Sequence, residues 1–169
     1  MPSLSELNTL TPTRFVASLA DIYEHSPWVA ACAEAQRPFA SVADLAAAMR
    51  ACVERADQSA QLALIRGHPE LAGKLAIRGE LTASSLAEQA AAGLNNCTAA
   101  EFAALTQLNL AYQQKFDFPF IVAVRGMHRA DIISAMRQRL AHTPVQEIDA
   151  ALQQIGRIAQ FRLSDLITD

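Results

Sequence analysis

The stretch TPVQEIDAALQQIGRIAQFRLSDLI, residues 143–167, decides the fold class of this chain. It begins with a threonine followed by a proline, a pair typical of a helix start, because proline suits the first helical position. Apolar residues then recur from Ile148 to Ala159 at intervals of 4, 3 and 4, and Leu166 continues the stripe. This is the period of one face of an α-helix. The stretch therefore predicts a long amphipathic helix that packs against other helices.

Similar patterns fill most of the chain before this helix. Helix starts are predicted near Thr13, at Ser26-Pro27, at Ser41, at the Ser84-Ser85 pair and at the capping box Thr98-x-x-Glu101. Residues 67–83, with three glycines and one proline, interrupt the pattern, and FDFPFIVAV at 116–124 is predicted to be extended because proline blocks a helix there. We therefore expect an all-α fold, a bundle of about eight helices forming a single domain over residues 1–169.

The composition narrows the class of partner. A hydrophobic fraction of 51% and a charged fraction of 18% are typical of a globular protein. The net charge of −3 and the absence of a Lys/Arg run argue against nucleic acid as a partner, but leave room for a small anionic metabolite. The longest apolar run, residues 118–124, is too short to span a membrane, and the first residues do not resemble a secretory signal. We therefore expect a cytoplasmic protein with no membrane partner.

The cysteine and glycine patterns argue against a cofactor. The three cysteines, Cys32, Cys52 and Cys97, form no CxxC or Cys/His cluster, which predicts reduced thiols rather than a disulfide or a zinc site. No glycine-rich phosphate loop is present either. The expectation is that the protein uses neither a metal nor an organic cofactor.

Arg162 is the first candidate functional residue. It occupies the gap in the stripe of the last helix, three residues after Ala159 and four before Leu166. A guanidinium on a buried face is costly unless an anion pairs with it, so the position indicates an anion-binding group. Two structural alternatives remain open, an arginine that extends to solvent and one that pairs with a structural carboxylate.

His68 and Glu88 are weaker candidates on pattern alone. His68 precedes Pro69, which favours an extended backbone, and histidine suits proton transfer near neutral pH. A solvated loop histidine is the alternative. Glu88 lies three residues after Ser85, so a capping box explains it equally well.

Four motifs follow one another along the chain: GHPELAGK at 67–74, ELTASSLAEQAAAGL at 80–94, LTQLNLAYQQKFDFPFIVAV at 105–124 and IGRIAQFRLSDL at 155–166. Taken together, they resemble the OHCU (2-oxo-4-hydroxy-4-carboxy-5-ureidoimidazoline) decarboxylase family. The resemblance runs from about Leu10 to the C-terminus. It implies an all-α carboxy-lyase without cofactors, which forms (S)-allantoin at the end of urate breakdown in purine catabolism.

The resemblance also implies the site. By motif, His68 and Glu88 match the family's catalytic residues and Arg162 its substrate-binding arginine; which of His68 and Glu88 protonates carbon stays open. Further residues match positions that line the family's pocket: Pro69, Ser85, Gln89, Phe120, Ile121, Val122, Ala123 and Val124. The partners implied are the substrate OHCU and the product allantoin, and since family members are often dimers, a homodimer is one expectation.

One position departs from the family pattern. Asp117 stands where the family usually has glycine, and aspartate is among the better-tolerated residues where φ is positive. Two other functions remain alternatives: a non-catalytic helical binding module, and a decarboxylase of a related ureido or imidazole acid.

Overall fold

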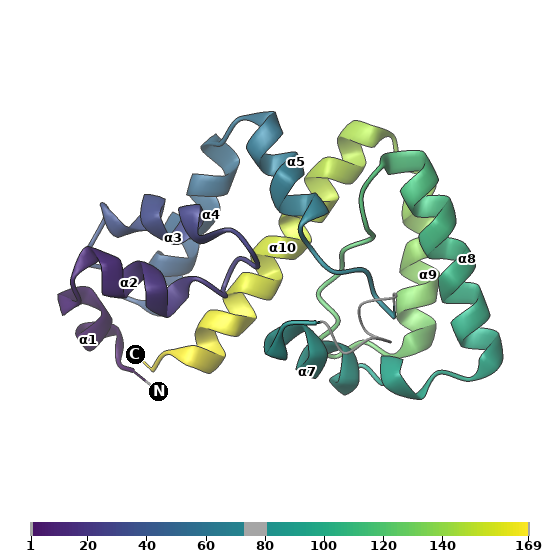
Figure 1. The fold of residues 1–169 in the computed structure, drawn as a ribbon, viewed down its shortest axis with the longest axis horizontal. Helices are drawn as coiled ribbons and strands as arrows, with labels where there is room; N and C mark the ends of the chain where they lie inside the picture. The colour runs from purple at the N-terminus through teal and green to yellow at the C-terminus, as the bar shows by residue number, and fades with distance from the viewer. Residues whose placement is uncertain (1, 73–80, 169) are drawn as a thin grey trace. The chain divides into compact units, whose positions relative to one another are not determined.

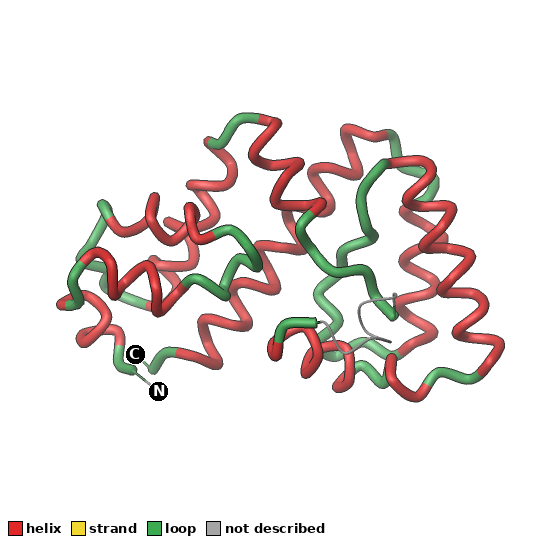
Figure 2. Tube along the Cα trace, in the orientation of Figure 1, coloured by secondary structure: helices red, strands yellow, loops and turns green. Residues whose placement is uncertain are grey.

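The computed structural model describes residues 2–72 and 81–168, and within these ranges the chain is helical with no β-strand (Figures 1 and 2). The prediction of an all-α fold is confirmed. The helices, in chain order, are α1 (Leu4–Thr9), α2 (Pro12–Leu19), α3 (Pro27–Glu34), α4 (Val42–Arg55), α5 (Gln58–Arg66), α7 (Ala83–Ala91), the short 3₁₀ helix η1 (Leu94–Asn96), α8 (Ala99–Phe116), α9 (Arg129–Arg139) and α10 (Pro144–Leu166).

The chain divides into two compact units. Unit 1 comprises residues 1–67 and 155–169, and unit 2 comprises residues 68–154. Helix α10 contributes its first part to unit 2 and its last part to unit 1. That residues 1–169 form a single domain stays a prediction. The described residues include no helix long and apolar enough to cross a membrane.

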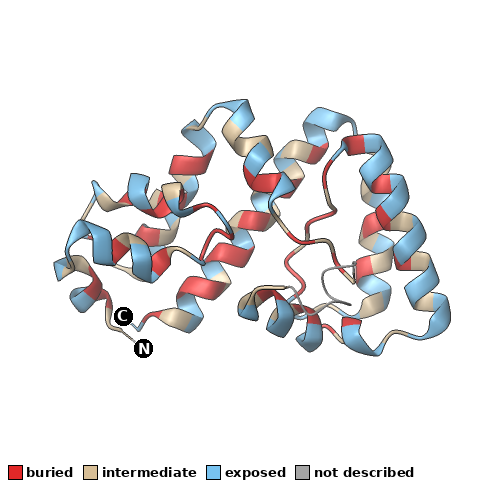
Figure 3. Cartoon of the chain, in the orientation of Figure 1, coloured by how far each residue is buried: buried red, intermediate tan, exposed pale blue. Residues whose placement is uncertain are grey.

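Unit 1 is built around the packing of α2, α3 and α4. Buried positions recur along these helices (Figure 3), and Phe15, Val29, Leu45 and Met49 are among the completely buried residues. Ser41 caps α4 as predicted, because its hydroxyl accepts a hydrogen bond from the N–H of Asp44, 3.1 Å away. The two ends of the described chain meet in this unit, where the N–H of Leu4 donates to the carbonyl of Thr168 at 2.9 Å.

The helix predicted to start near Thr13 begins at Pro12, with Thr11 as its N-cap residue. A further helix, α1, precedes it with a capping box of Ser3 and Glu6 that was not predicted. The prediction of reduced cysteines is wrong for this unit, because Cys32 and Cys52 form a disulfide between α3 and α4. The packing of two neighbouring helices brings these Cα atoms to 6.1 Å, within disulfide range, and a separation of 20 residues gives no hint of this contact.

Unit 2 has an aromatic core. Tyr112 and Phe116 lie on the buried face of α8, and Phe118 and Phe120 follow in the extended segment. The Tyr112 ring lies 4.6 Å from that of Phe116 and 5.3 Å from that of Phe120, centre to centre. The predicted capping box of Thr98 and Glu101 opens α8. Of the segment 116–124 that was predicted to be extended, Phe116 is instead the last residue of α8, and residues 117–124 are non-helical. The aromatic cluster therefore attaches the extended segment to α8.

Helix α8 ends in a residue with a left-handed backbone conformation, Asp117. Asp117 has φ 60° and ψ 30°, and its N–H donates to the carbonyl of Gln113 at 2.9 Å. This is a common helix ending, usually made by glycine because a Cβ is strained there. The position thus needs the positive φ that would explain a glycine, and aspartate adopts it here.

Candidate active site

Arg162 lies on the buried face of α10, within unit 1. Only 6% of the residue is exposed, so it does not extend to solvent. Its Nη2 donates to Oε2 of Glu24 at 3.4 Å, and its Nη1 donates to the carbonyl of Asp21 at 3.2 Å. Glu24 is itself buried, which makes it the structural carboxylate that the second alternative required. These contacts, made by two different nitrogens, orient the guanidinium plane.

The buried face of α10 differs from the predicted stripe at three positions. Ile148, Leu152 and Leu166 are half-exposed. Between Glu147 and Leu163, the buried positions are Glu147, Ala151, Ile155, Ile158, Ala159, Arg162 and Leu163. The reason is that the helix turns a carboxylate, Glu147, into the core of unit 2, where cationic and hydroxyl groups surround it. Because one buried position carries a polar residue, the apolar stripe in the sequence is displaced by one residue from the buried face of the helix.

His68 lies in unit 2, just after the end of α5, in an irregular turn. It is half-buried, and Pro69 behind it is buried. The predicted irregular stretch 67–83 lies partly outside the described residues. Within the described part, Ala72 adopts a positive φ of 49°, so the turn that follows His68 is sharply bent.

Two amide side chains hold this turn from different helices. Oε1 of Gln89, on α7, accepts a hydrogen bond from the N–H of Ala72 at 3.0 Å, and its Nε2 donates to the carbonyl of Glu70 at 3.4 Å. Nδ2 of Asn109, on α8, donates to the carbonyl of Leu71 at 2.9 Å. Irregular backbone needs such partners when it is buried. Gln89, predicted to bind substrate, therefore also supports the turn that carries His68.

Glu88 is not a capping residue. Helix α7 begins at Ala83, and its N-cap is Thr82, whose hydroxyl accepts from the N–H of Ser85 at 3.3 Å. Ser85 is buried at the third helical position, and Glu88 is the sixth residue of the helix, too far from the end to cap it. The capping interpretation is wrong, which leaves half-buried Glu88 without that structural explanation.

The segment Phe120–Val124 of unit 2, which we call the wall because it is predicted to line the pocket, belongs to no helix or strand. Four of its side chains are buried and that of Val122 is half-buried. Two backbone groups are already engaged: the N–H of Ala123 donates to Oε1 of Gln154 at 3.0 Å, and the carbonyl of Ile121 accepts from Nη1 of Arg139 at 2.6 Å. The wall is therefore held from α9 and α10.

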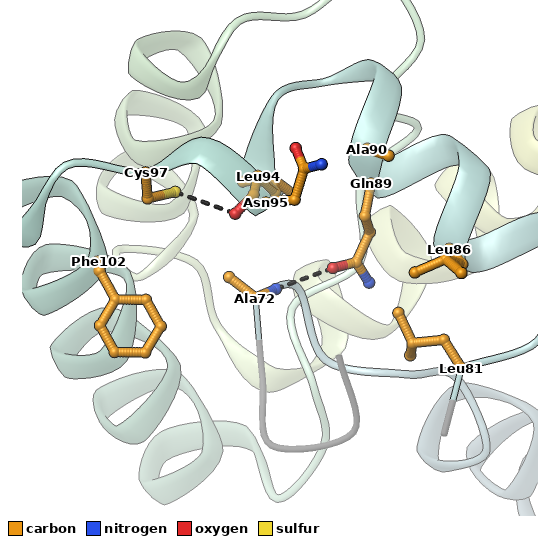
Figure 4. A pocket seen from close by; sticks show the side chains of 9 residues that line it. All are labelled: Ala72, Leu81, Leu86, Gln89, Ala90, Leu94, Asn95, Cys97 and Phe102. Atoms are coloured by element: carbon orange, nitrogen blue, oxygen red, sulfur yellow. Dashed lines mark hydrogen bonds between the residues drawn. The ribbon is translucent and has the colours of Figure 1, made fainter. Parts of the chain in front are cut away.

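A cavity of about 320 Å³ lies beside α7 (Figure 4). Its walls are mostly apolar, with Leu86, Leu94 and Phe102 among them, and Gln89 and Cys97 add polar atoms. Burial raises the pKa of the Cys97 thiol, so this free cysteine is a poor nucleophile. Among the described residues, Gln89 is the one predicted site residue that lines this cavity. Ala72, from the turn that follows His68, lines the cavity as well, whereas neither His68 nor Glu88 is among its lining residues.

The structure brings together part of the predicted site. Unit 2 contains His68, Pro69, Ser85, Glu88, Gln89 and residues 120–124, and Gln89 links α7 directly to the His68 turn. Arg162 belongs to unit 1. That all of these residues converge on one pocket stays a prediction. Over residues 2–72 and 81–168, no group of three His, Cys, Asp or Glu side chains is placed to hold a metal ion.

The residues that support the site were not predicted from the sequence. Asn109 stands in the buried stripe of α8 between Leu105 and Tyr112, and a polar residue in an apolar stripe was the available signal. Glu24 carried a similar signal, since it follows Ile22 and Tyr23, both buried, just before Ser26-Pro27. Neither pattern names the partner, because the partners are far away in sequence.

Comparisons with known proteins agree with these motifs. The family model described as OHCU decarboxylase matches residues 8–164. A 2-oxo-4-hydroxy-4-carboxy-5-ureidoimidazoline decarboxylase of Haloferax volcanii is 39% identical over 163 residues, 96% of this chain and 95% of the relative. A uric acid degradation bifunctional protein of Bacillus subtilis is 38% identical over 169 residues, 100% of this chain and 33% of that protein.

A solved structure of (S)-allantoin synthase superimposes with a TM-score of 0.80 at 30% identity, covering 98% of this chain and 54% of that one. The Haloferax relative matches nearly the whole chain at 39% identity. At that level, the similarity shows more than a shared fold. The chain belongs to the OHCU decarboxylase family.

Proposed function

We propose that this protein is a carboxy-lyase that decarboxylates 2-oxo-4-hydroxy-4-carboxy-5-ureidoimidazoline to (S)-allantoin in urate degradation. The observation that carries the proposal is the full-length similarity to the Haloferax volcanii decarboxylase, with His68, Glu88 and Arg162 all present at the motif positions. The Bacillus relative is named for uric acid degradation, which supports the pathway, and the structural neighbour is named for (S)-allantoin synthesis, which supports the product.

The reaction breaks one carbon–carbon bond and forms one carbon–hydrogen bond. Carbon dioxide leaves C4, and the electron pair left behind spreads over the adjacent C5=N bond, which gives an enol. The enol hydroxyl then loses its proton to become the C4 carbonyl, and a proton adds to one face of C5, the carbon that carries the ureido group. The protein must hold the substrate, orient the departing carboxylate and deliver the proton.

Arg162 is the proposed anion-binding group. Its planar guanidinium presents paired donors to a carboxylate or carbonyl oxygen. The support for this role is that Arg162 matches the arginine of the family's motif; its bonds to Glu24 and to the carbonyl of Asp21 fix the direction of the guanidinium plane. An oriented donor pair costs less entropy when the anion binds.

His68 and Glu88 are the proposed proton-transfer pair. His68 acts on the substrate hydroxyl or returns the proton to carbon, and Glu88 orients the ureido N–H groups or the imidazole. The support is that Glu88 has no capping role, and that the turn after His68 is anchored by Gln89 from the helix that carries Glu88. Pro69, Ser85, Gln89 and the Phe120–Val124 backbone are the proposed pocket lining.

The deciding experiment follows optical activity. Freshly prepared OHCU is mixed with the protein, and circular dichroism monitors the formation of (S)-allantoin while a coupled assay measures carbon dioxide. We expect both signals to rise together, well above the spontaneous rate, and the allantoin to be the S enantiomer. Racemic product at the spontaneous rate would favour a non-catalytic binding module. Acceleration with another ureido or imidazole acid alone would favour the second alternative.

Glu88→Gln tests the proton-transfer pair within the same assay. Glutamine has nearly the shape of glutamate but no charge, so we expect kcat to fall by about 10²-fold with thermal stability unchanged. Glu54→Gln, at an exposed position on α4, is the control and should leave kcat unchanged. Normal turnover in Glu88→Gln would remove Glu88 from the mechanism.

Two expectations accompany the proposal. Activity should survive dialysis against a chelator, since no cofactor is expected; loss of activity that one added metal restores would contradict this. A homodimer is expected from the family, and sedimentation equilibrium of the purified chain measures it.

A further inference from the structure

Glu147 is a completely buried carboxylate near the start of α10, in unit 2. It accepts hydrogen bonds from the Tyr112 hydroxyl, from Nε of Arg139 at 2.8 Å and from Nη2 of Arg139, and its second oxygen lies 2.7 Å from Nδ1 of His142. Burial, and then the bond to Glu147, raises the pKa of Tyr112, so the phenol keeps its proton and donates. A buried charge persists only with such partners.

Arg139 extends this cluster to the extended wall. While Nε and Nη2 bind Glu147, Nη1 donates to the carbonyl of Ile121 at 2.6 Å. The guanidinium carbon also lies 4.5 Å from the centre of the Phe120 ring. One planar group therefore contacts a buried carboxylate, a wall carbonyl and an aromatic ring.

The wall depends on such outside contacts. Residues 118–124 belong to no helix or strand, so no regular ladder of backbone hydrogen bonds fixes their φ and ψ angles. Gln154 holds the N–H of Ala123, and Arg139 holds the carbonyl of Ile121. Glu147 fixes the guanidinium plane, and because the plane is rigid, that orientation sets the position of the third nitrogen.

We propose that Arg139, oriented by Glu147, is a positioning residue for the decarboxylation: it holds the backbone of Ile121 and the ring of Phe120 in the geometry that the substrate pocket requires. The inference rests on the proposed function, because it takes Phe120–Val124 as a pocket wall. Arg139 itself does not touch the reacting atoms. It acts through the wall, where a displacement of about 1 Å is enough to cost on the order of 10²-fold in rate.

The competing interpretation is that Arg139 and Glu147 form an ion pair that only stabilises unit 2. The two interpretations differ for lysine. An ammonium keeps the charge that Glu147 needs, but it cannot bond the carboxylate and the Ile121 carbonyl in the fixed directions of a guanidinium. A purely structural pair therefore predicts that lysine restores both stability and turnover, whereas a positioning role predicts that lysine restores stability alone.

The experiment compares Arg139→Lys and Arg139→Ala with Arg137→Ala, an exposed arginine on the same helix. Kinetics are measured well below the melting temperature of each variant, so that every sample is folded. We expect kcat/KM to fall about 10- to 100-fold in both Arg139 variants, thermal stability to recover substantially in Arg139→Lys relative to Arg139→Ala, and Arg137→Ala to match the wild type. Wild-type kcat/KM in folded Arg139→Lys would overturn the inference.

Hydrogen–deuterium exchange supplies a readout that needs no substrate. The amides of residues 120–124 should exchange faster in both Arg139 variants than in Arg137→Ala, while those of the turn at residues 69–72 should not change. Unchanged exchange in the wall would also overturn the inference. A wild-type protein that fails to decarboxylate OHCU would instead refute the proposed function, so the two failures are distinguishable.

Discussion

Unit 1 and unit 2 hold their candidate functional residues by different means. In unit 1, Arg162 lies on a regular helix and is oriented by a buried carboxylate, Glu24. In unit 2, His68 lies in an irregular turn whose backbone is held by the neutral amides of Gln89 and Asn109. Unit 1 also contains the disulfide, whereas the cysteine of unit 2 is free.

The chemistry of each group explains the difference. A permanently charged guanidinium can be buried only beside an anion or strong acceptors. The turn that carries His68 has backbone N–H and C=O groups that need partners, and a neutral amide side chain can accept from one and donate to the other. We therefore expect that removing a support in unit 1 costs mainly stability, while changing the group held in unit 2 costs mainly turnover.

The largest expected effect is that of His68→Asn. Asparagine retains hydrogen-bonding ability but cannot transfer a proton near neutral pH, so we expect kcat to fall by about 10³-fold. Because the residue is half-exposed in a turn, the free energy of unfolding should change by no more than about 0.5 kcal/mol. Steady-state kinetics beside chemical denaturation measure both.

The control for this variant is His25→Asn. His25 is exposed in unit 1 with φ 56°, a conformation that asparagine tolerates well, so activity and stability should both remain normal. Turnover near the wild-type level in His68→Asn would show that the turn of unit 2 carries no essential proton-transfer group. The expected difference between the two units would then be wrong.

Glu24→Gln should have the next largest effect, and mainly on stability. The substitution keeps the shape but leaves the Arg162 guanidinium buried without its anion, which costs about 3 to 5 kcal/mol of unfolding free energy. Glu54→Gln is the matched control, because its exposed pair with Arg50 contributes little. If urea denaturation gave the two variants equal stabilities, Glu24 would not be the support of Arg162.

Removing the disulfide should affect unit 1 alone. Cys32 and Cys52 are 20 residues apart, and replacing both by serine should lower the free energy of unfolding by about 3 kcal/mol, with kcat unchanged at low temperature. Cys97→Ser is the control. Thiol titration of the oxidised protein, unfolded without reductant, should detect one thiol; detection of three would show that the disulfide does not form.

The smallest effect concerns Asp117 at the end of α8. With φ at 60°, glycine should be more stable than alanine at this position by about 1 kcal/mol, because only the Cβ is strained there. Asp117→Gly and Asp117→Ala both lose the carboxylate, so their difference isolates the backbone term. Thermal melts of the two variants measure it, and equal melting temperatures would mean that the helix ends differently.

The sequence by itself determined the fold class and most helix boundaries. These depend on local chemistry: the capping box of Thr98 and Glu101, Ser41 before α4, and Pro119 after α8 each act within a few residues. The place of Arg162 on the apolar stripe of the last helix also followed from the helical period, but whether its side chain is buried or extends to solvent stayed open until the structure showed it to be buried. The motif order then identified the family.

Only the tertiary structure decided which groups hold the site. Arg162 contacts Glu24, 138 residues away in sequence, Asn109 contacts Leu71, 38 residues away, and Cys32 bonds to Cys52. Helix α7 starts at Ala83, earlier than predicted, so Glu88 lies too far along the helix to cap it. Capping residues and prolines act on backbone groups within one helical turn, so their positions in the sequence predict where helices begin and end. The partner of a buried charge, a turn carbonyl or a thiol is set by how helices pack, and no spacing along the chain encodes that distance.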